Sequence, residues 1–333
     1  MLVLAVIPVA LSAQDPGKTA IPLDHFYVTP RHGGNIFRRA LRNVHFGAYT
    51  GFGDTFFKNQ VSGFGFYQPP GGMPELFTTA STTAHRFTNW INNPGSDQTA
   101  PGSYVIRNPG AADISFKGHA INIPLAGTVH YEFNRYRIGA GYSYELMHIG
   151  TLRPTSLADQ IGPIAPASPT GFVRKYWGMA GVSFYRWNEY LFTADLQVGN
   201  YKLKTNFNNA AVTTTTFFNL GVTVEGDLSE YLRVFARPAY EIKSYQLNVP
   251  GSGLAIPYKV NALYLQVGFN YSIPELPRCF LKDCHAQINH AHGNREYRSR
   301  RHPVYKKQNP GYGENDPTLI KYKGKNKKKI NPY

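Results

Sequence analysis

Apolar and polar residues alternate with a period of two in eight segments between residues 42 and 273. In the first segment, about 42–58, Val44, Phe46 and Phe52 share one face, whereas His45 and Tyr49 share the other. Successive side chains of a β-strand point to opposite faces, so this pattern predicts strands with one apolar and one polar face. The other predicted strands cover about 115–133, 136–151, 172–187, 190–204, 214–227, 231–247 and 259–273.

The connections between these strands alternate strictly between short and long. The short turns are 134–135, 187–189 and 228–230, and the long connections are 59–114, 152–171, 205–213 and 248–258. This alternation is typical of membrane barrels, with short turns on the periplasmic side and long loops outside. It predicts an all-β fold, an eight-stranded antiparallel up-and-down transmembrane β-barrel over 42–273 with both termini in the periplasm. A soluble lipocalin-like barrel would bury its apolar face inside, and the polar, glycine-rich inner faces argue against it.

Composition agrees with a barrel in a membrane. Aromatic residues make up 14% of the chain although the mean hydropathy is only −0.34. Aromatic girdles at both lipid interfaces account for such a combination. The apolar run from Leu2 to Ser12, followed by Ala13, predicts a signal peptide over 1–13, with an apolar N-terminal strand as the alternative. An N-terminal segment, 14–41, has no clear period.

The predicted inner faces carry charges of both signs. An eight-stranded barrel is just wide enough for side chains to fill its interior. Buried charges are costly unless they pair, so we expect a plug of ion pairs, with a polar pore as the alternative. The residues concerned are Glu132, Arg137, Glu145, Asp195, Glu225, Arg233, Arg237, Glu241 and Lys243.

The end of the last predicted strand resembles the signal that assembly machinery recognises in outer-membrane barrels. Its key positions are Gln266, Gly268, Tyr271 and Ile273. With the strands and short turns, residues 42–273 resemble small OmpA/OmpX-like outer-membrane barrels. The Ser-Ala-Gln signal end and the Tyr- and Asn-rich strands resemble proteins of Bacteroidota, some of whose small barrels serve the type IX secretion and gliding apparatus. This resemblance implies an outer-membrane location in contact with lipid.

A basic tail, 274–333, follows the barrel. It holds 14 Lys and Arg and five Asp and Glu, so its net charge of 14 − 5 = +9 is most of the chain's +15. Apolar residues are scarce, which predicts a mostly irregular segment. In the periplasm it could dock an acidic protein surface, anionic lipid or peptidoglycan, while the compartment argues against nucleic acid; a solvated tail without a partner is the alternative. The candidate contact residues are Arg298, Arg300, Arg301, Lys327, Lys328 and Lys329.

Both cysteines of the chain, Cys279 and Cys284, lie in this tail. In an exported protein, a close pair predicts a disulfide. Cys279, Cys284, His285 and His290 together offer a zinc ligand set as the alternative. The spacing Cys-x4-Cys-His also resembles a lengthened c-type haem motif, but its spacer departs from the usual two residues, and we expect no cofactor.

Three functions are open at this point. The first is a non-enzymatic outer-membrane anchor whose tail docks a periplasmic protein or peptidoglycan. The second is a barrel whose long extracellular loop, 59–114, binds a ligand or surface. The third is a lipid A-modifying enzyme, but His148 and His119 have no serine nearby on their face, so the sequence favours a protein that is not an enzyme.

Overall fold

The computed structural model describes residues 36–78, 86–97, 114–187, 190–228, 231–274, 276–281, 290–292 and 295–297. The chain divides into two units, one formed by residues 35–275 with 304–306, and one formed by the remaining N- and C-terminal residues. Each is described by itself. Among the described residues, no helix is both long enough and apolar enough to cross a bilayer.

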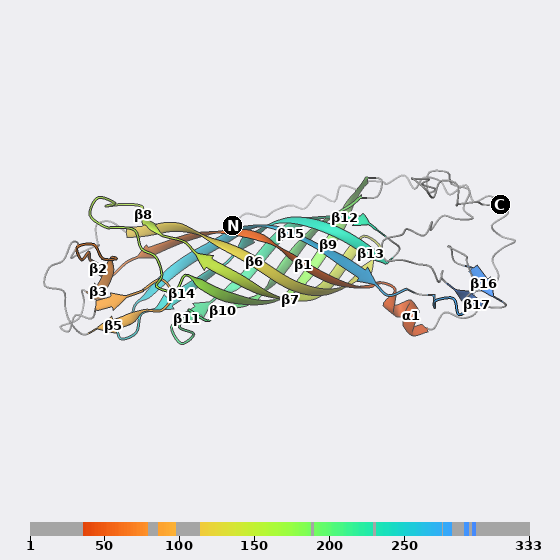
Figure 1. Cartoon of the computed structure of the whole chain (residues 1–333), viewed down its shortest axis with the longest axis horizontal. Coiled ribbons are helices and arrows are strands. Elements are labelled where there is room, and N and C mark those ends of the chain that lie inside the picture. The colour runs from red at the N-terminus through yellow and green to blue at the C-terminus, as the bar shows by residue number, and fades with distance from the viewer. Residues whose placement is uncertain are drawn as a thin grey trace, which may run out of the picture. The chain divides into compact units, whose positions relative to one another are not determined.

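Eight antiparallel strands form a closed ring, which confirms the predicted fold class (Figure 1). Each strand pairs with its neighbours along the chain, and the first and last strands close the ring through a register that includes Thr50 opposite Val267. In ring order the strands are β1 (Val44–Val61), β6 (Ile114–Phe133), β7 (Tyr136–Ile149), β9 (Thr170–Trp187), β10 (Tyr190–Lys204), β12 (Thr216–Asp227), β13 (Leu232–Ile242) and β15 (Ala255–Ser272).

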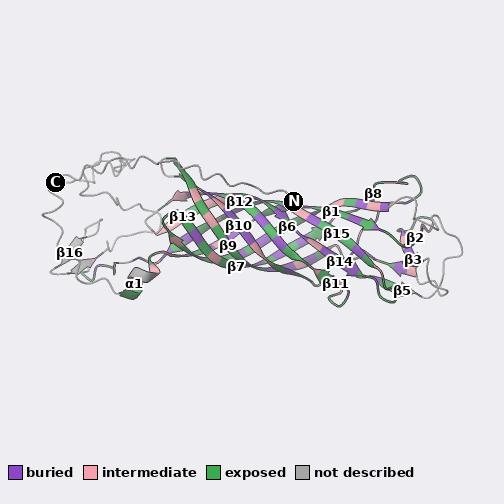
Figure 2. Cartoon of the chain, turned by 180° about the vertical axis from the view of Figure 1, so that it is seen from behind, coloured by how far each residue is buried: buried purple, intermediate pink, exposed green. Residues whose placement is uncertain are grey.

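The outer surface of the ring is apolar, and exposed and buried residues alternate along each strand (Figure 2). On β7, outward side chains from Tyr136 to Leu146 are exposed and almost all apolar or aromatic. Ten residue steps at 3.4 Å, on a strand tilted by about 40°, correspond to a band about 26 Å tall. This matches the apolar band of a transmembrane barrel.

The two ends of the barrel differ. At the turn end, short turns such as 134–135 join the strands, β1 begins at Val44 and β15 ends at Ser272. A short helix, α1 (Ile36–Leu41), precedes β1 in a segment for which the sequence showed no period. Arg38 Nη1 of this helix donates to the carbonyl oxygen of Pro274 at 3.5 Å. This contact joins the segments before and after the barrel strands.

At the opposite end, the cap end, the long connections fold into a compact cap. The segment 59–114, predicted as a loop, contains a four-stranded sheet of β2 (Phe64–Tyr67), β3 (Glu75–Thr78), β4 (Arg86–Thr88) and β5 (Gly95–Asp97). Three further strands, β8 (Arg153–Pro154), β11 (Val212–Thr214) and β14 (Ser244–Asn248), extend the barrel sheet. Strands of two to five residues are too short to show a periodic pattern, which explains why the sequence concealed them.

Aromatic side chains form the core of the cap. Trp90 is fully buried, its Nε1 donates to the Pro74 carbonyl at 3.0 Å, and its ring meets Phe116 edge-on at 5.1 Å. Tyr258 donates to the Trp90 carbonyl at 3.0 Å, and its ring stacks on Tyr245 at 4.6 Å. Tyr245 lies beyond the apolar band, and burial raises its pKa well above the ordinary tyrosine value. The cap therefore covers this end of the barrel with a dry, packed core.

The second unit contains a short hairpin within the predicted irregular tail. Here β16 (His290–His292) pairs with β17 (Arg295–Tyr297), and the ring of Phe280 meets that of Tyr297 at 5.3 Å. Cys279 is buried. The predicted disulfide and zinc set remain predictions, because Cys284 and His285 lie outside the described residues. The same holds for the signal peptide 1–13, the basic residues Arg298, Arg300 and Arg301, and the cluster 327–329.

Candidate functional site

The barrel interior holds charged side chains because inward glycines leave room for them. A Cβ atom on Gly221 would lie 2.6 Å from Cζ of Arg237, and one on Gly181 would lie 2.9 Å from Nε of Arg137. A larger residue at either position would displace a guanidinium group. The glycines in the alternating pattern therefore have a steric role, which is to let long side chains extend across the lumen.

Nearest the cap is a layer of four charges and a phenol. Lys175 Nζ lies 2.6 Å from Glu145 Oε1 and 2.7 Å from Glu241 Oε1. Lys243 Nζ lies 2.7 Å from the same Glu241 oxygen. Tyr264 donates its hydroxyl to Glu145 Oε2 at 3.1 Å. All five side chains are buried, and two cations face two anions, so this layer carries no net formal charge.

In the middle of the barrel, Asp195 lies between two arginines. Arg137 Nη2 donates to its Oδ2 at 2.9 Å, and Arg237 Nε donates to its Oδ1 at 2.7 Å. Thr223 adds a hydroxyl donor at 2.6 Å, and Glu225 accepts from Arg137 Nη1 at 2.7 Å. Arg237 also donates to Asn219 and Gln266. Again two buried cations meet two buried anions, as the cost of burying charge requires.

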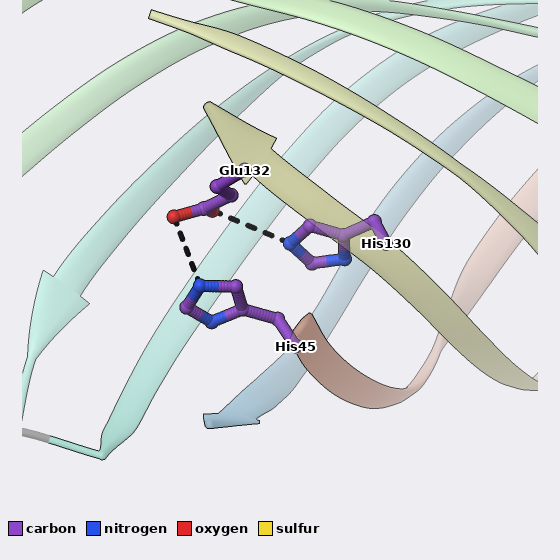
Figure 3. Close-up of side chains that lie close together, drawn as sticks. All are labelled: His45, His130 and Glu132. Atoms are coloured by element: carbon purple, nitrogen blue, oxygen red, sulfur yellow. Dashed lines mark hydrogen bonds and ion pairs between the residues drawn. The ribbon is translucent and has the colours of Figure 1, made fainter. Parts of the chain in front are cut away.

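The third layer is at the turn end and contains two histidines (Figure 3). His45 Nε2 lies 3.1 Å from Glu132 Oε2, and His130 Nε2 lies 3.3 Å from Glu132 Oε1. The two imidazole rings stack with centroids 5.2 Å apart, since His45 and His130 are direct partners of β1 and β6. Arg233 Nη1 lies 2.8 Å from Glu132 Oε2, and Arg233 Nε lies 3.2 Å from Asp227.

These three layers fill the lumen. A cavity of about 30 Å³ lies beside the middle layer, lined by residues that include Tyr49, His130 and Arg137. A volume of this size holds only about two water molecules. The paired charges connect different strands from the inside, so this arrangement can hold the barrel rigid.

All nine charged residues singled out from the sequence lie in these layers, but other partners in them were not singled out, among them Lys175, Asp227 and two histidines. Lys175 follows the inward parity of the strand 172–187, so its alternation was available as a signal. The sequence pattern puts His45 on the polar face of the first strand, but the predicted set of interior charges includes neither His45 nor His130. Histidines in an alternating strand next to a predicted inward glutamate are the signal that would have found them.

The cluster of His45, His130 and Glu132 has the composition of a metal site, with its ligand atoms within 4.8 Å of one another. Two features oppose that role. Arg233 already donates to both oxygens of Glu132, at 3.1 and 2.8 Å, and its positive charge opposes a cation. His130 Nδ1 is buried and lacks a hydrogen-bond partner among the described residues, whereas a metal-bound histidine normally donates its second nitrogen to an acceptor. The cluster fits an ion-pair network better than a metal centre.

The predicted assembly signal occupies the strand that closes the ring. Gln266 is buried and accepts a hydrogen bond from Arg237 Nη1 at 2.9 Å, and a side chain at Gly268 would collide with Ala48 and Tyr49. Tyr271 is exposed on the outer surface, and Ile273 follows the end of β15.

The outward histidines have polar partners. His119, treated as isolated from its sequence neighbours, lies 3.1 Å from Asp54 on β1, because the register of β1 and β6 brings these positions together. His148 Nδ1 lies 2.9 Å from the hydroxyl of Thr170. In the part of the chain that the structure describes, neither histidine contacts a serine.

No protein-family profile and no curated protein matches the chain. Among solved structures, it is similar to the outer membrane protein OprG of Pseudomonas aeruginosa, with 9% identity over 70% of this chain and 98% of that chain, at a TM-score of 0.37. It is also similar to the outer membrane protein AlkL in lipid bilayers, with 9% identity over 69% and 90% and a TM-score of 0.35. A third similar structure is the outer membrane protease OmpT of Escherichia coli, with 10% identity over 70% and 97% and a TM-score of 0.30. The closed ring of eight antiparallel strands with an apolar outer surface is itself the fold of an outer-membrane β-barrel.

Proposed function

We propose that this protein is a closed, non-enzymatic outer-membrane anchor, with its cap outside the cell and its basic tail docking a partner in the periplasm. The single observation that carries this proposal is the filled interior. Two layers of buried, mutually paired charges and a packed cap oppose transport through the barrel. A rigid barrel without a passage is suited to anchoring other parts of the chain to the membrane.

The position of the tail supports the same reading. The last barrel strand ends at Ser272, at the end of the barrel that holds the short turns. Short turns face the periplasm in bacterial outer-membrane barrels. The chain after Ser272 then continues on the periplasmic side, where 14 basic residues against five acidic ones suit an acidic protein surface or the carboxylates of peptidoglycan.

The test compares charge variants of the full chain. Arg298, Arg300 and Arg301 are changed together to glutamate, and the matched control changes the same three residues to lysine. Both proteins and the wild type are purified from crosslinked envelopes, and heat-modifiable gel mobility verifies that each barrel is folded. We expect the wild type and the lysine control to recover a periplasmic protein or peptidoglycan fragments that the glutamate variant loses. Equal recovery by all three would refute docking through these arginines.

A second candidate places the function outside the cell. The segment 59–114 contributes a folded sheet with its own aromatic core, and a folded surface is suited to ligand recognition. Deleting the exposed residues 70–73, between β2 and β3, would then cause a phenotype that the tail variants do not cause. The absence of enzyme activity is part of our proposal as well. A change in lipid A structure between wild-type cells and cells lacking the protein would overturn it.

A further inference from the structure

Four basic side chains form one row across the outer surface of the barrel at the cap end. Lys58 of β1 is directly opposite Lys259 of β15 on one side and Lys117 of β6 on the other. Arg153 of β8 is opposite Lys117. All four residues are exposed. We call this group the basic row (Lys58, Lys117, Arg153 and Lys259).

The depth of the basic row matches that of lipid headgroups. Lys58 follows Phe56, which is the last outward apolar residue of β1, by two positions. Two residues along a tilted strand advance about 5 Å past the edge of the apolar band. Below the basic row, exposed Phe52, Ile121 and Leu263 continue toward the middle of the band. An amphipathic molecule lying against this face would meet apolar side chains below and cations above.

The basic row has no counter-charge within the described chain. Among the described residues, no ion pair or hydrogen bond is seen through the side chain of any of its four members. Like charges directly opposite each other on neighbouring strands are destabilising. The nearest outward acid on β1 is Asp54, and it is paired with His119 at 3.1 Å. The repulsion within the basic row therefore calls for an anion from outside the protein.

We propose that the basic row is a binding site for the phosphate groups of a lipid A-type glycolipid in the outer leaflet. This inference rests on the proposed function only in placing the cap end outside. A glycolipid with one phosphate at each end of a disaccharide headgroup presents two doubly charged anions that lie well apart. Four cations with neighbours about 5 Å apart form a row about 15 Å long, which is long enough to contact both phosphates. A phospholipid with one phosphate would engage only part of the row.

The test measures lipid binding to the full-length protein in detergent. Native mass spectrometry and the thermal unfolding midpoint are recorded with added bisphosphorylated lipid A, with dephosphorylated lipid A and with phosphatidylglycerol. The variant K58S/K117S/K259S removes three charges, and K58R/K117R/K259R keeps them. A double variant at the opposite rim, R135S/R186S, controls for loss of surface charge in general.

We expect bisphosphorylated lipid A to bind the wild type and the arginine variant, and to bind the serine variant roughly a hundredfold more weakly, at about fivefold per basic residue. The rim control should bind like the wild type. Equal binding by the serine variant would overturn the proposal, and so would equal binding of phosphatidylglycerol or dephosphorylated lipid A to the wild type. If the serine variant does not fold, K117S alone and the comparison of lipids on the wild type decide the question.

This assay requires neither the tail nor a periplasmic partner. A negative result in the tail experiment therefore leaves the lipid proposal standing, and the converse also holds. The shared assumption is tested separately by adding protease to intact cells. Cleavage within the cap supports the outward orientation, whereas protection in intact cells with cleavage after lysis contradicts it.

Discussion

Replacing Asp195 by asparagine removes one charge from the middle layer and hardly changes the size of the side chain. The carboxylate is fully buried and accepts from Arg137, Arg237 and Thr223 at 2.6 to 2.9 Å. In the variant, the side-chain NH2 group of the asparagine replaces one carboxylate oxygen. This NH2 group then faces a hydrogen-bond donor of Arg137 or Arg237 and cannot accept a hydrogen bond from it. Arg137 then keeps Glu225 as an ionic partner, whereas Arg237 keeps only its hydrogen bonds to Asn219 and Gln266.

The expected cost follows from this geometry. Removing one partner of a buried ion pair typically destabilises a protein by about 3–5 kcal/mol, because the other charge stays buried. The amide oxygen still accepts one hydrogen bond, so we expect about 3 kcal/mol for Asp195→Asn. The matched control is Asp54→Asn, which removes the same charge from a side chain that is 40% exposed and paired with His119. Exposed pairs contribute about 0–1 kcal/mol.

The assay is urea unfolding of the full-length protein in lipid vesicles, followed by fluorescence of its three tryptophans. The midpoint and the slope are fitted together, because only a change of midpoint at constant slope reports stability. The reasoning is refuted if Asp195→Asn lowers the free energy of unfolding by no more than Asp54→Asn does. In that case the middle layer would be solvated, and the closed interior would lose its main support.

Three further predictions use the same protein. Gly221→Val should destabilise the barrel by about 1–3 kcal/mol through overpacking against Arg237, whereas Gly127→Ala, with its nearest neighbour at 3.9 Å, should unfold like the wild type in urea. Zinc should leave the thermal midpoint of the wild type unchanged but raise that of Arg233→Leu, and an equal rise in both proteins would contradict the electrostatic argument against a metal. The raised pKa of Tyr245 means that the unfolded state loses this proton first, so the cap should lose stability as pH rises above about 10. The rate of proteolysis of the cap, measured as a function of pH, reports this loss of stability. Tyr245→Phe should weaken the pH dependence of that rate. An unchanged pH profile in the variant would mean that other groups cause the dependence.

The barrel was predictable because its signal is local and repeated. The strand predicted over 190–204 is β10, Tyr190–Lys204, and the predicted 136–151 is β7, Tyr136–Ile149. One buried face and one lipid-exposed face give every strand the same period, so each strand can be recognised without knowledge of its partners.

The cap and the pairing inside the barrel were not predictable in the same way. The short strands of the cap are held by contacts between distant segments, such as that of Tyr258 with Trp90, and no period marks them. In the interior, parity indicates which face a charge occupies. It does not indicate that Arg137 meets Asp195 and Glu225, because those contacts depend on how far neighbouring strands are staggered around the ring.

The core of the cap brings together residues that are far apart in the sequence. Tyr258 and Trp90, for example, are 168 positions apart. Contacts of such high contact order form late, because the chain entropy of closing the intervening loop is lost before the contact stabilises the fold. Tyr258 belongs to β15, the strand that closes the ring against β1. The last strand therefore contributes both to the pairing that closes the barrel and to the cap. A folding intermediate in which β1 and β15 have not paired also lacks an intact cap. The time at which the cap becomes resistant to protease therefore reports when the barrel has closed in the membrane.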